Sequence, residues 1–168
     1  MRPSGVLLTS SHDREGFDCG HPVLNGYLHS YALQDMKRRV CRVYVLNSPE
    51  GGAIKGFYTL SATSLCFESI PDDLKKRLPK YPLPAVLIGR LAVDQKSQKQ
   101  GLGRHLLMDA LYRIVLAEES IGIYAAAVDA KDEQARAFYE RYGFVSFKDQ
   151  PLKLFLPLST AKQALLED

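Results

Sequence analysis

The spacing of apolar residues in the first quarter of the chain predicts one short strand followed by one helix. The apolar run at residues 6–9 is typical of a strand. Apolar residues then recur at helical spacing over residues 23–32, Tyr31 among them, after a start signal at 18–22. We expect this helix to end in the basic residues 37–39, because cations suit the negative C-terminal end of a helix dipole.

The next pattern predicts an antiparallel hairpin. Residues 41–46 and 54–61 are rich in β-branched and aromatic side chains, and they flank the turn sequence 47–52. A short helix is expected at 72–78, before the proline-rich segment 79–84.

In the second half, strand patterns alternate with helix patterns. Asp132 is expected to cap a helix that Gly143 closes at its C′ position. The last ten residues form a tail or a short helix. The other predicted elements are strands at 85–93, 121–128, 144–147 and 152–156, a glycine turn at 98–101 and an amphipathic helix at 102–117.

This alternation implies parallel neighbouring strands with right-handed crossovers. We therefore predict one α/β domain over residues 1–168 with a mixed sheet, antiparallel in its N-terminal half and parallel βαβαβ in its C-terminal half.

Composition supports a globular protein and excludes several classes. The chain has 168 residues, of which 46% are apolar and 24% charged, so it is neither disordered nor of low complexity. It has no apolar run of membrane-spanning length and no signal-peptide pattern, so we expect no membrane association. The three cysteines are odd in number and widely spaced, which favours reduced thiols in a cytoplasmic protein and argues against a metal site. We expect Cys66 to be a core thiol.

The net charge of +3 is small, but its placement is uneven. All of the excess positive charge lies in residues 1–84, mainly in a cluster at 37–42 and another at 75–80. A solvated helix face explains such clusters as well as a nucleic-acid contact does.

The glycine turn predicts an anion site. Backbone amide groups at the start of a helix have no partners within it, and the helix dipole adds positive potential there. Gly101 and Gly103 let a phosphate approach the main chain, and Lys99 and Arg104 add charge. The sequence lacks the P-loop pattern, and the third glycine position of the dinucleotide fingerprint is Leu106. A pyrophosphate is the expected ligand.

The motifs around this turn resemble those of the GNAT N-acetyltransferases. They are Arg90-Leu91-Ala92-Val93, Gln98-x-x-Gly101-x-Gly103-Arg104 and Ala135-Arg-Ala-Phe138-Tyr139-Glu-Arg-Tyr142-Gly143-Phe144. The resemblance implies an acetyl-CoA core at about 85–158 and an acceptor-binding half at about 1–84. Two positions depart from the family pattern, because Lys99 replaces a common glycine and Asp132 replaces a frequent asparagine.

By this resemblance, the strand that ends at Val93 binds the pantetheine arm and the turn binds the pyrophosphate of acetyl-CoA. The implied cofactor residues are Leu91, Ala92, Val93, Gln98, Lys99, Gln100, Gly101, Leu102, Gly103, Arg104, Asp132, Ala135 and Phe138.

Tyr139 stands at the position of the family's general acid. A phenol with a pKa near 10 stays protonated at neutral pH and can protonate a departing thiolate. None of the four histidines or the carboxylates stands out as a general base. This absence suits an α-amine, whose pKa of about 7.7–8.0 lies well below the roughly 10.4 of lysine.

The N-terminal half resembles the GNAT toxins that acetylate the α-amine of aminoacyl-tRNA. The matching residues are Phe17-Asp-Cys-Gly20, Leu24-Asn25-x-Tyr27-Leu28 and Lys37-Arg38-Arg39. The resemblance implies a homodimeric toxin that blocks translation and is neutralised by a ribbon–helix–helix antitoxin. It also gives the basic clusters a second interpretation as phosphate contacts to tRNA. The candidates are Lys37, Arg38, Arg39, Lys75, Lys76, Arg77 and Arg90.

Two other functions stay open on the sequence. One is an acetyltransferase for a small polyamine, an antibiotic or a protein N-terminus, although a polyamine site would favour acidic residues. The other is an acetyl-CoA-binding module without turnover.

Overall fold

The computed structural model describes residues 4–167, which form two compact units. Unit 1 contains residues 4–61 and 89–113, and unit 2 contains residues 62–88 and 114–167. The strands are β1 (Val6–Leu7), β2 (Arg42–Asn47), β3 (Ile54–Leu65), β4 (Leu83–Val93), β5 (Ala125–Asp129), β6 (Val145–Ser146) and β7 (Lys153–Pro157). Within the sheet, neighbouring strands follow the order β1-β2-β3-β4-β5-β7-β6. β3 and β4 each contain residues of both units.

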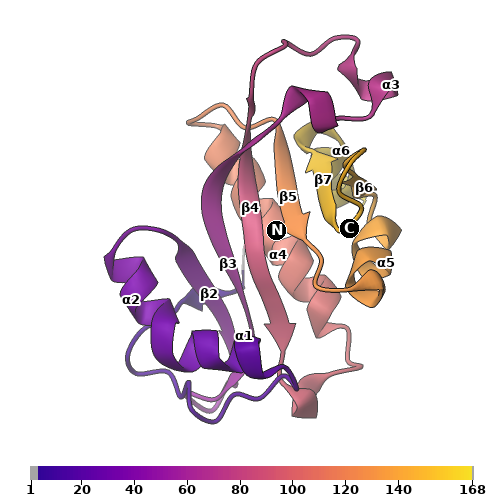
Figure 1. Cartoon of the computed structure of the whole chain (residues 1–168). Coiled ribbons are helices and arrows are strands. Elements are labelled where there is room, and N and C mark those ends of the chain that lie inside the picture. Colours follow the sequence, from indigo (N-terminus) through magenta and orange to yellow (C-terminus); the bar gives the residue numbers. More distant parts are fainter. Residues whose placement is uncertain (1–3, 168) are drawn as a thin grey trace. The chain divides into compact units, whose positions relative to one another are not determined.

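Helices of three kinds connect these strands (Figure 1). The α-helices are α1 (Pro22–Gly26), α2 (Ala32–Lys37), α3 (Asp72–Lys75), α4 (Leu102–Glu118), α5 (Glu133–Arg141) and α6 (Leu158–Leu166). A π-helical segment, η1 (Tyr27–Tyr31), joins α1 to α2, and the short 3-10 helices are η2 (Phe67–Ser69) and η3 (Gln95–Ser97).

Unit 1 contains the predicted hairpin. β2 and β3 pair antiparallel with Tyr44 opposite Tyr58, and β1 pairs antiparallel with β2. The core of this unit includes Phe17 and Phe57, whose rings meet edge to face at 5.4 Å between centroids. α1 and α2 cover the hairpin on one side, as Figure 1 shows. The hairpin prediction is confirmed.

The helix predicted over residues 23–39 is interrupted by a wider turn. In η1, the amide of Ala32 donates to the carbonyl of Tyr27, five residues back instead of four. The extra residue rotates the positions that follow it relative to a regular α-helix. Tyr31 is therefore 58% exposed while Ala32 is fully buried. The prediction that Tyr31 shares the apolar face is wrong for this reason.

Unit 2 contains the parallel pair predicted for the second half. β4 and β5 run parallel, with Ala85 opposite Ala125. β7 pairs antiparallel with both β5 and β6, so β4, β5 and β6 share one direction, as predicted for βαβαβ. However, β7 lies between β5 and β6 in the sheet. β6 and β7 form a hairpin whose connection ends in a turn closed by Lys153 N–H to Gln150 O (3.0 Å).

The strand predicted from Ile121 begins later than expected. Ile121 is 65% exposed, and β5 starts at Ala125, where the pairing with β4 begins. The exposed residues Ile121 and Gly122 form part of the connection after α4 instead. Apolar character alone did not distinguish this connection from a buried strand.

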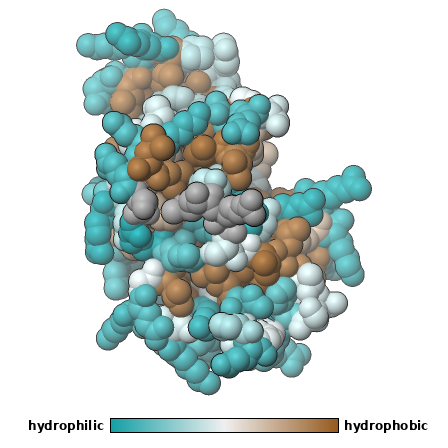
Figure 2. Space-filling view, turned by 180° about the vertical axis from the view of Figure 1, so that it is seen from behind, coloured by the Kyte–Doolittle hydropathy of each residue, from teal (hydrophilic) through white to brown (hydrophobic). Residues whose placement is uncertain are grey.

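The surface is mainly hydrophilic on the face shown in Figure 2, with smaller apolar patches between the polar side chains. None of the helices in residues 4–167 combines the length and the apolar character needed to cross a bilayer. Within the same residues, histidine, cysteine and acidic side chains do not gather in threes that could hold a metal ion.

Candidate functional site

The loop between β4 and α4 is fixed by two polar side chains of unit 1. The carboxylate of the buried Asp94 accepts hydrogen bonds from the backbone amides of Lys96 at 2.9 Å and Asp18 at 3.0 Å. The side-chain amide nitrogen of Gln98 donates to the carbonyl oxygens of Val93 at 2.9 Å and Cys19 at 3.2 Å. Gln98 was predicted to contact the cofactor, and its amide nitrogen holds the loop in place.

Two loop residues adopt a left-handed backbone conformation. Lys99 has φ of 63° and Gly101 has φ of 77°. Glycine reaches this region freely, whereas a residue with a Cβ is strained there by roughly 1–2 kcal/mol. This conformation explains why a glycine is common at the position of Lys99 in the family that the sequence resembles. A Cβ atom placed on Gly101 would have no other atom within 4 Å, so the space beside this residue is open. A ligand can therefore come close to the main chain there.

The backbone amides of this loop are available to a ligand. The amide groups of residues 99–103 donate to no acceptor among the described residues 4–167. They precede or begin α4, whose N-terminal dipole adds positive potential. The exposed ammonium group of Lys99 adds a full positive charge. Amides without an acceptor among residues 4–167, open space and positive charge are suited to a diphosphate. Gln100, Leu102, Gly103 and Arg104 complete the predicted anion site.

The predicted pantetheine strand is the last part of β4. Ala92 is buried, and Leu91 and Val93 are partly buried. Together with the loop, these residues place the predicted cofactor positions 91–104 in unit 1.

Tyr139 lies on α5 in unit 2. Only 7% of the residue is exposed, and its ring packs against Phe138 at 5.2 Å and Phe144 at 5.5 Å between centroids. This burial raises the pKa of Tyr139 to about 12. Its hydroxyl hydrogen-bonds to no described residue, and it is not among the buried unpaired polar atoms, so it reaches the surface. The phenol is therefore a protonated group with a free donor.

α5 begins as the sequence predicted. The carboxylate of Asp132 accepts a hydrogen bond from the amide of Ala135 at 2.8 Å and caps the helix. The helix is followed by Gly143, whose φ of 94° is the left-handed conformation expected at C′. Asp132 thus replaces the family's asparagine with an equally good cap. Phe138 packs between Tyr139 and Tyr142.

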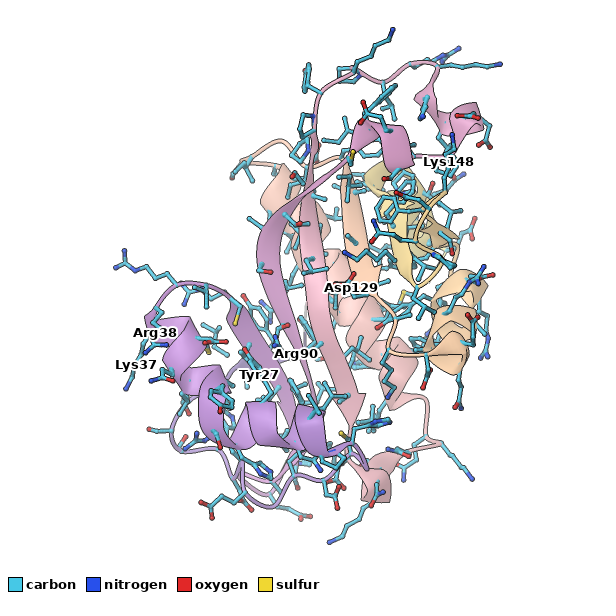
Figure 3. All side chains as sticks on the ribbon, in the orientation of Figure 1. Tyr27, Lys37, Arg38, Arg90, Asp129 and Lys148 are labelled. Carbon is cyan, nitrogen blue, oxygen red and sulfur yellow. The ribbon has the colours of Figure 1, made fainter. Side chains whose placement is uncertain are left out.

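The basic residues of unit 1 fall into two groups. Lys37, Arg38 and Arg39 are exposed at the C-terminal end of α2, and Figure 3 shows the first two extending away from the helix. Arg90 instead stacks on the ring of Tyr27, with the guanidinium 3.5 Å from the ring centroid. Arg90 therefore has a protein partner, which makes it a less available phosphate ligand than predicted.

The basic cluster of unit 2 is also divided. The ammonium of Lys75 lies 3.5 Å from a carboxylate oxygen of Asp72, donates to the carbonyl of Glu68 at 3.2 Å and faces the ring of Phe67. Lys76 and Arg77 are exposed. Of this cluster, Lys75 is engaged within the protein while its two neighbours face solvent.

Comparison with known proteins identifies the family. The model of the "Acetyltransferase (GNAT) domain" matches residues 39–146. The chain belongs to the GNAT acetyltransferase family.

Individual relatives of this GNAT chain are toxins. It is 37% identical over 161 residues to a tRNA-acetylating toxin of Mycobacterium tuberculosis, covering 96% of this chain and 95% of that protein. Among solved structures, AtaT complexed with acetyl-methionyl-tRNAfMet is 29% identical with a TM-score of 0.88, over 95% of this chain and 96% of AtaT. A tyrosine-to-phenylalanine mutant of AtaT bound to the C-terminus of antitoxin AtaR and acetyl-CoA is 27% identical with a TM-score of 0.81, over 95% of both chains.

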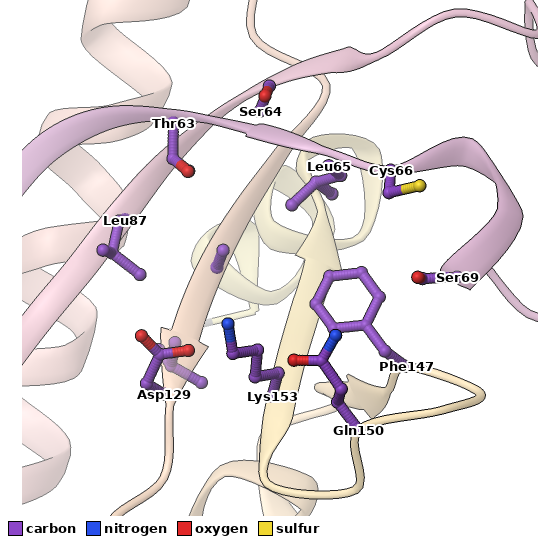
Figure 4. Close-up of a pocket in the computed structure, with 12 residues that line it drawn as sticks. Thr63, Ser64, Leu65, Cys66, Ser69, Leu87, Asp129, Phe147, Gln150 and Lys153 are labelled. Atoms are coloured by element: carbon purple, nitrogen blue, oxygen red, sulfur yellow. The ribbon is translucent and has the colours of Figure 1, made fainter.

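One feature of the GNAT chain was missed by sequence reasoning. Unit 2 contains a cavity of about 210 Å³ that is lined partly by Thr63, Leu87, Asp129 and Lys153 (Figure 4). These residues come from four strands and carry no common motif, so only the strand register reveals them. Cys66 lies at this cavity and is exposed, so the prediction of a core thiol is wrong. Its position directly after β3 takes it out of the core, and its thiol donates to Glu68 at 3.1 Å.

Proposed function

We propose that this GNAT protein transfers an acetyl group from acetyl-CoA to the α-amine of aminoacyl-tRNA and thereby blocks translation as the toxin of a toxin–antitoxin pair. Relatives that cover almost the whole chain support this, because one is a tRNA-acetylating toxin and another was solved with an acetylated aminoacyl-tRNA. Within this chain, the proposal is carried by the amides of residues 99–103, which donate to no acceptor among residues 4–167.

The loop and the strand before it would hold acetyl-CoA. The amides of residues 99–103 are suited to the diphosphate, and Lys99 adds charge beside them. The edge of β4 at Leu91–Val93 would bind the pantetheine arm. Acetyl-CoA supplies the acetyl group as a reactive thioester.

Tyr139 has the properties that the leaving group requires. Transfer forms a bond between the amine nitrogen and the acetyl carbon and breaks the bond between that carbon and sulfur, and the departing thiolate then takes a proton. The hydroxyl of Tyr139 is protonated at neutral pH, because burial raises its pKa to about 12. It donates that proton to sulfur and is reprotonated from solvent.

The amine can lose its proton without a dedicated side chain. An α-amino group has a pKa of about 7.7–8.0, so a substantial fraction is neutral at physiological pH. Water accepts the proton that the nitrogen releases on attack. The α-amine of an aminoacyl ester therefore suits a site in which the sequence offers no general base.

Partners follow from the same proposal. Lys37, Arg38, Arg39, Lys76 and Arg77 are exposed and are suited to the phosphates of tRNA. We infer a homodimer that acts in the cytoplasm, where tRNA is charged, and a ribbon–helix–helix antitoxin that neutralises it. The complexes of the AtaT relative with the antitoxin AtaR support an antitoxin partner, and the ribbon–helix–helix fold of that partner is part of our proposal.

Incubation with labelled acetyl-CoA and bulk charged tRNA tests the function. We expect N-acetylated amino acids after the ester is hydrolysed, and no transfer to spermidine or to an N-terminal peptide. Tyr139→Phe is the matched control, because it keeps the ring packing and removes only the hydroxyl.

Two results would overturn the proposal. Acetylated spermidine or peptide beside unmodified charged tRNA would show a different acceptor. Binding of acetyl-CoA without transfer to any of the three acceptors would show a module without turnover.

A further inference from the structure

The cavity of unit 2 places two opposite charges on neighbouring strands. Asp129, the last residue of β5, stands directly opposite Lys153, the first residue of β7. Figure 4 shows both side chains extending into the same space, with Thr63 and Leu87 across from them. Residues that face each other in an antiparallel pair have Cβ atoms only about 4.5–5.5 Å apart.

These two charges have no partner in the described part of the chain. Neither the carboxylate of Asp129 nor the ammonium of Lys153 takes part in a hydrogen bond or an ion pair with any of residues 4–167, including each other. Among the described residues that line this cavity, only Asp129 and Lys153 carry a charge. The cavity therefore offers a ligand one free acceptor and one free donor a short distance apart.

The size of the cavity suits a small group. Its volume of about 210 Å³ lies below the roughly 300–1,000 Å³ of pockets that enclose drug-sized ligands. An amino-acid residue is a better match to this volume than a nucleotide. Apolar side chains of Leu65, Leu87 and Phe147 form part of the lining and suit the carbon atoms of such a residue.

A second cavity adjoins the first. It has a volume of about 310 Å³ and shares Ser64 and Cys66 with its neighbour. Its lining includes Lys80 and Tyr81, and Tyr81 is 65% exposed. An exposed aromatic ring beside a lysine is the usual platform for a base of single-stranded nucleic acid.

We propose that these two adjoining cavities receive the aminoacylated 3′ end of tRNA, with the α-ammonium group at Asp129, the ester carbonyl at Lys153 and a base of the terminal nucleotides on Tyr81. The ammonium nitrogen and the carbonyl oxygen of an aminoacyl ester are separated by only two carbon atoms, which matches the two neighbouring charges. This inference rests on the proposed function, since it names the site of the same acceptor.

Asp129 acts here as a positioning residue. It binds the charged amine on arrival, and the amine becomes a nucleophile only after its proton has left to solvent. Loss of the carboxylate therefore raises KM for aminoacyl-tRNA and leaves kcat within about threefold. A hydrogen bond to a charged group is worth about 1.5–3 kcal/mol, which corresponds to a rise in KM of roughly 10- to 100-fold.

The decisive experiment compares tRNA charged with an amino acid and tRNA charged with the matching α-hydroxy acid. Dissociation constants are measured without acetyl-CoA at pH 6.5, where most of the α-amine is protonated. The wild-type protein should prefer the aminoacyl form by about tenfold or more. Asp129→Asn should bring this ratio close to one, and Asp149→Asn, a nearby exposed residue outside the cavity lining, should leave it unchanged.

Two further variants, each with a matched control, test the other contacts. Lys153→Met should weaken both charged tRNAs equally, because both carry the ester carbonyl, and Lys131→Met should weaken neither. Tyr81→Ala should weaken both by roughly 5- to 100-fold, whereas Tyr81→Phe keeps the stacking ring and the affinity. Acetyl-CoA affinity and the melting temperature should stay at wild-type values in every variant.

Failure of the inference is distinct from failure of the proposed function. If the wild-type protein acetylates aminoacyl-tRNA and Asp129→Asn keeps the tenfold preference, the cavity is not the amine site and the function stands. An equal loss for both charged tRNAs in Asp129→Asn would likewise overturn the role of its charge. If the wild-type protein acetylates no charged tRNA, the proposed function itself is wrong.

Discussion

At the scale of single residues, Lys99 combines a backbone conformation that favours glycine with a charge at the anion loop. Its φ of 63° is one of two positive values among the described non-glycine residues, the other being at Arg39. Lys99→Gly should raise the free energy of unfolding by up to about 1 kcal/mol, because the relief of backbone strain exceeds the added entropy of the unfolded chain. Urea denaturation measures this difference.

Gln100→Gly is the matched control for that prediction. Gln100 has no positive φ, so glycine there only loosens the unfolded chain and should lower the free energy of unfolding by roughly 0.5–1 kcal/mol. Equal destabilisation by both variants would contradict the strain at Lys99. Acetyl-CoA should bind Lys99→Gly several times more weakly, since the loop loses its positive side chain.

The ionisation of Tyr139 sets a limit on the pH dependence of transfer. The phenol donates only in its protonated form, which persists until the pH approaches its pKa of about 12. The acceptor amine attacks only when neutral, and this fraction grows with pH through a pKa of about 8 or lower. Initial rates should therefore give a kcat/KM that rises from pH 6 and reaches a plateau by pH 9 without falling. A decline below pH 9.5 would contradict the assignment of Tyr139 as the acid.

At the scale of elements, the sequence predicted those parts of the fold that local chemistry determines. Asp132 caps the start of α5, and Gly143 ends the helix in a left-handed conformation. Both features depend on only a few neighbouring atoms. The π-helical turn at Tyr27–Tyr31 was not predictable, because an extra residue leaves the apolar spacing almost unchanged. The cavity charges Asp129 and Lys153 meet only through the β5–β7 register, which no local pattern encodes.

A buried network in unit 1 connects α4 to β3 and to the N-terminal segment. The carboxylate of Asp109, only 5% exposed, accepts hydrogen bonds from the hydroxyl of Tyr58 at 2.5 Å and from the amides of Ser4 at 2.5 Å and Gly5 at 3.3 Å. Arg113 lies 3.7 Å away, donates to Tyr58 at 2.9 Å and also donates to the carbonyl of Gly5.

Removal of this carboxylate should be costly, because it leaves several buried donors and a cation without a partner. Asp109→Ala is expected to lower the free energy of unfolding by about 3–5 kcal/mol, and Tyr58→Phe by about 1–2 kcal/mol. Denaturation followed by circular dichroism checks both values. A loss below 1 kcal/mol for Asp109→Ala would show that the network adds little to stability.

At the scale of the whole molecule, the excess positive charge predicts salt-dependent binding of tRNA. In the structure, however, the individual basic residues differ in how available they are to phosphates. The side chains of Lys37 and Arg38 are exposed and have no partner among the described residues, whereas the side chain of Lys75 is held by Asp72 and Glu68. Each phosphate contact contributes about −0.9 to the slope of log K against the logarithm of salt concentration on a duplex. The double variant Lys37→Glu, Arg38→Glu should therefore reduce the slope by nearly two, and Lys75→Gln by less than half a unit. Binding of tRNA between 50 and 250 mM KCl, a range over which phosphate contacts weaken strongly, measures both slopes. An unchanged slope in the double variant would identify the end of α2 as a solvated helix terminus and leave unit 2 to provide the phosphate contacts.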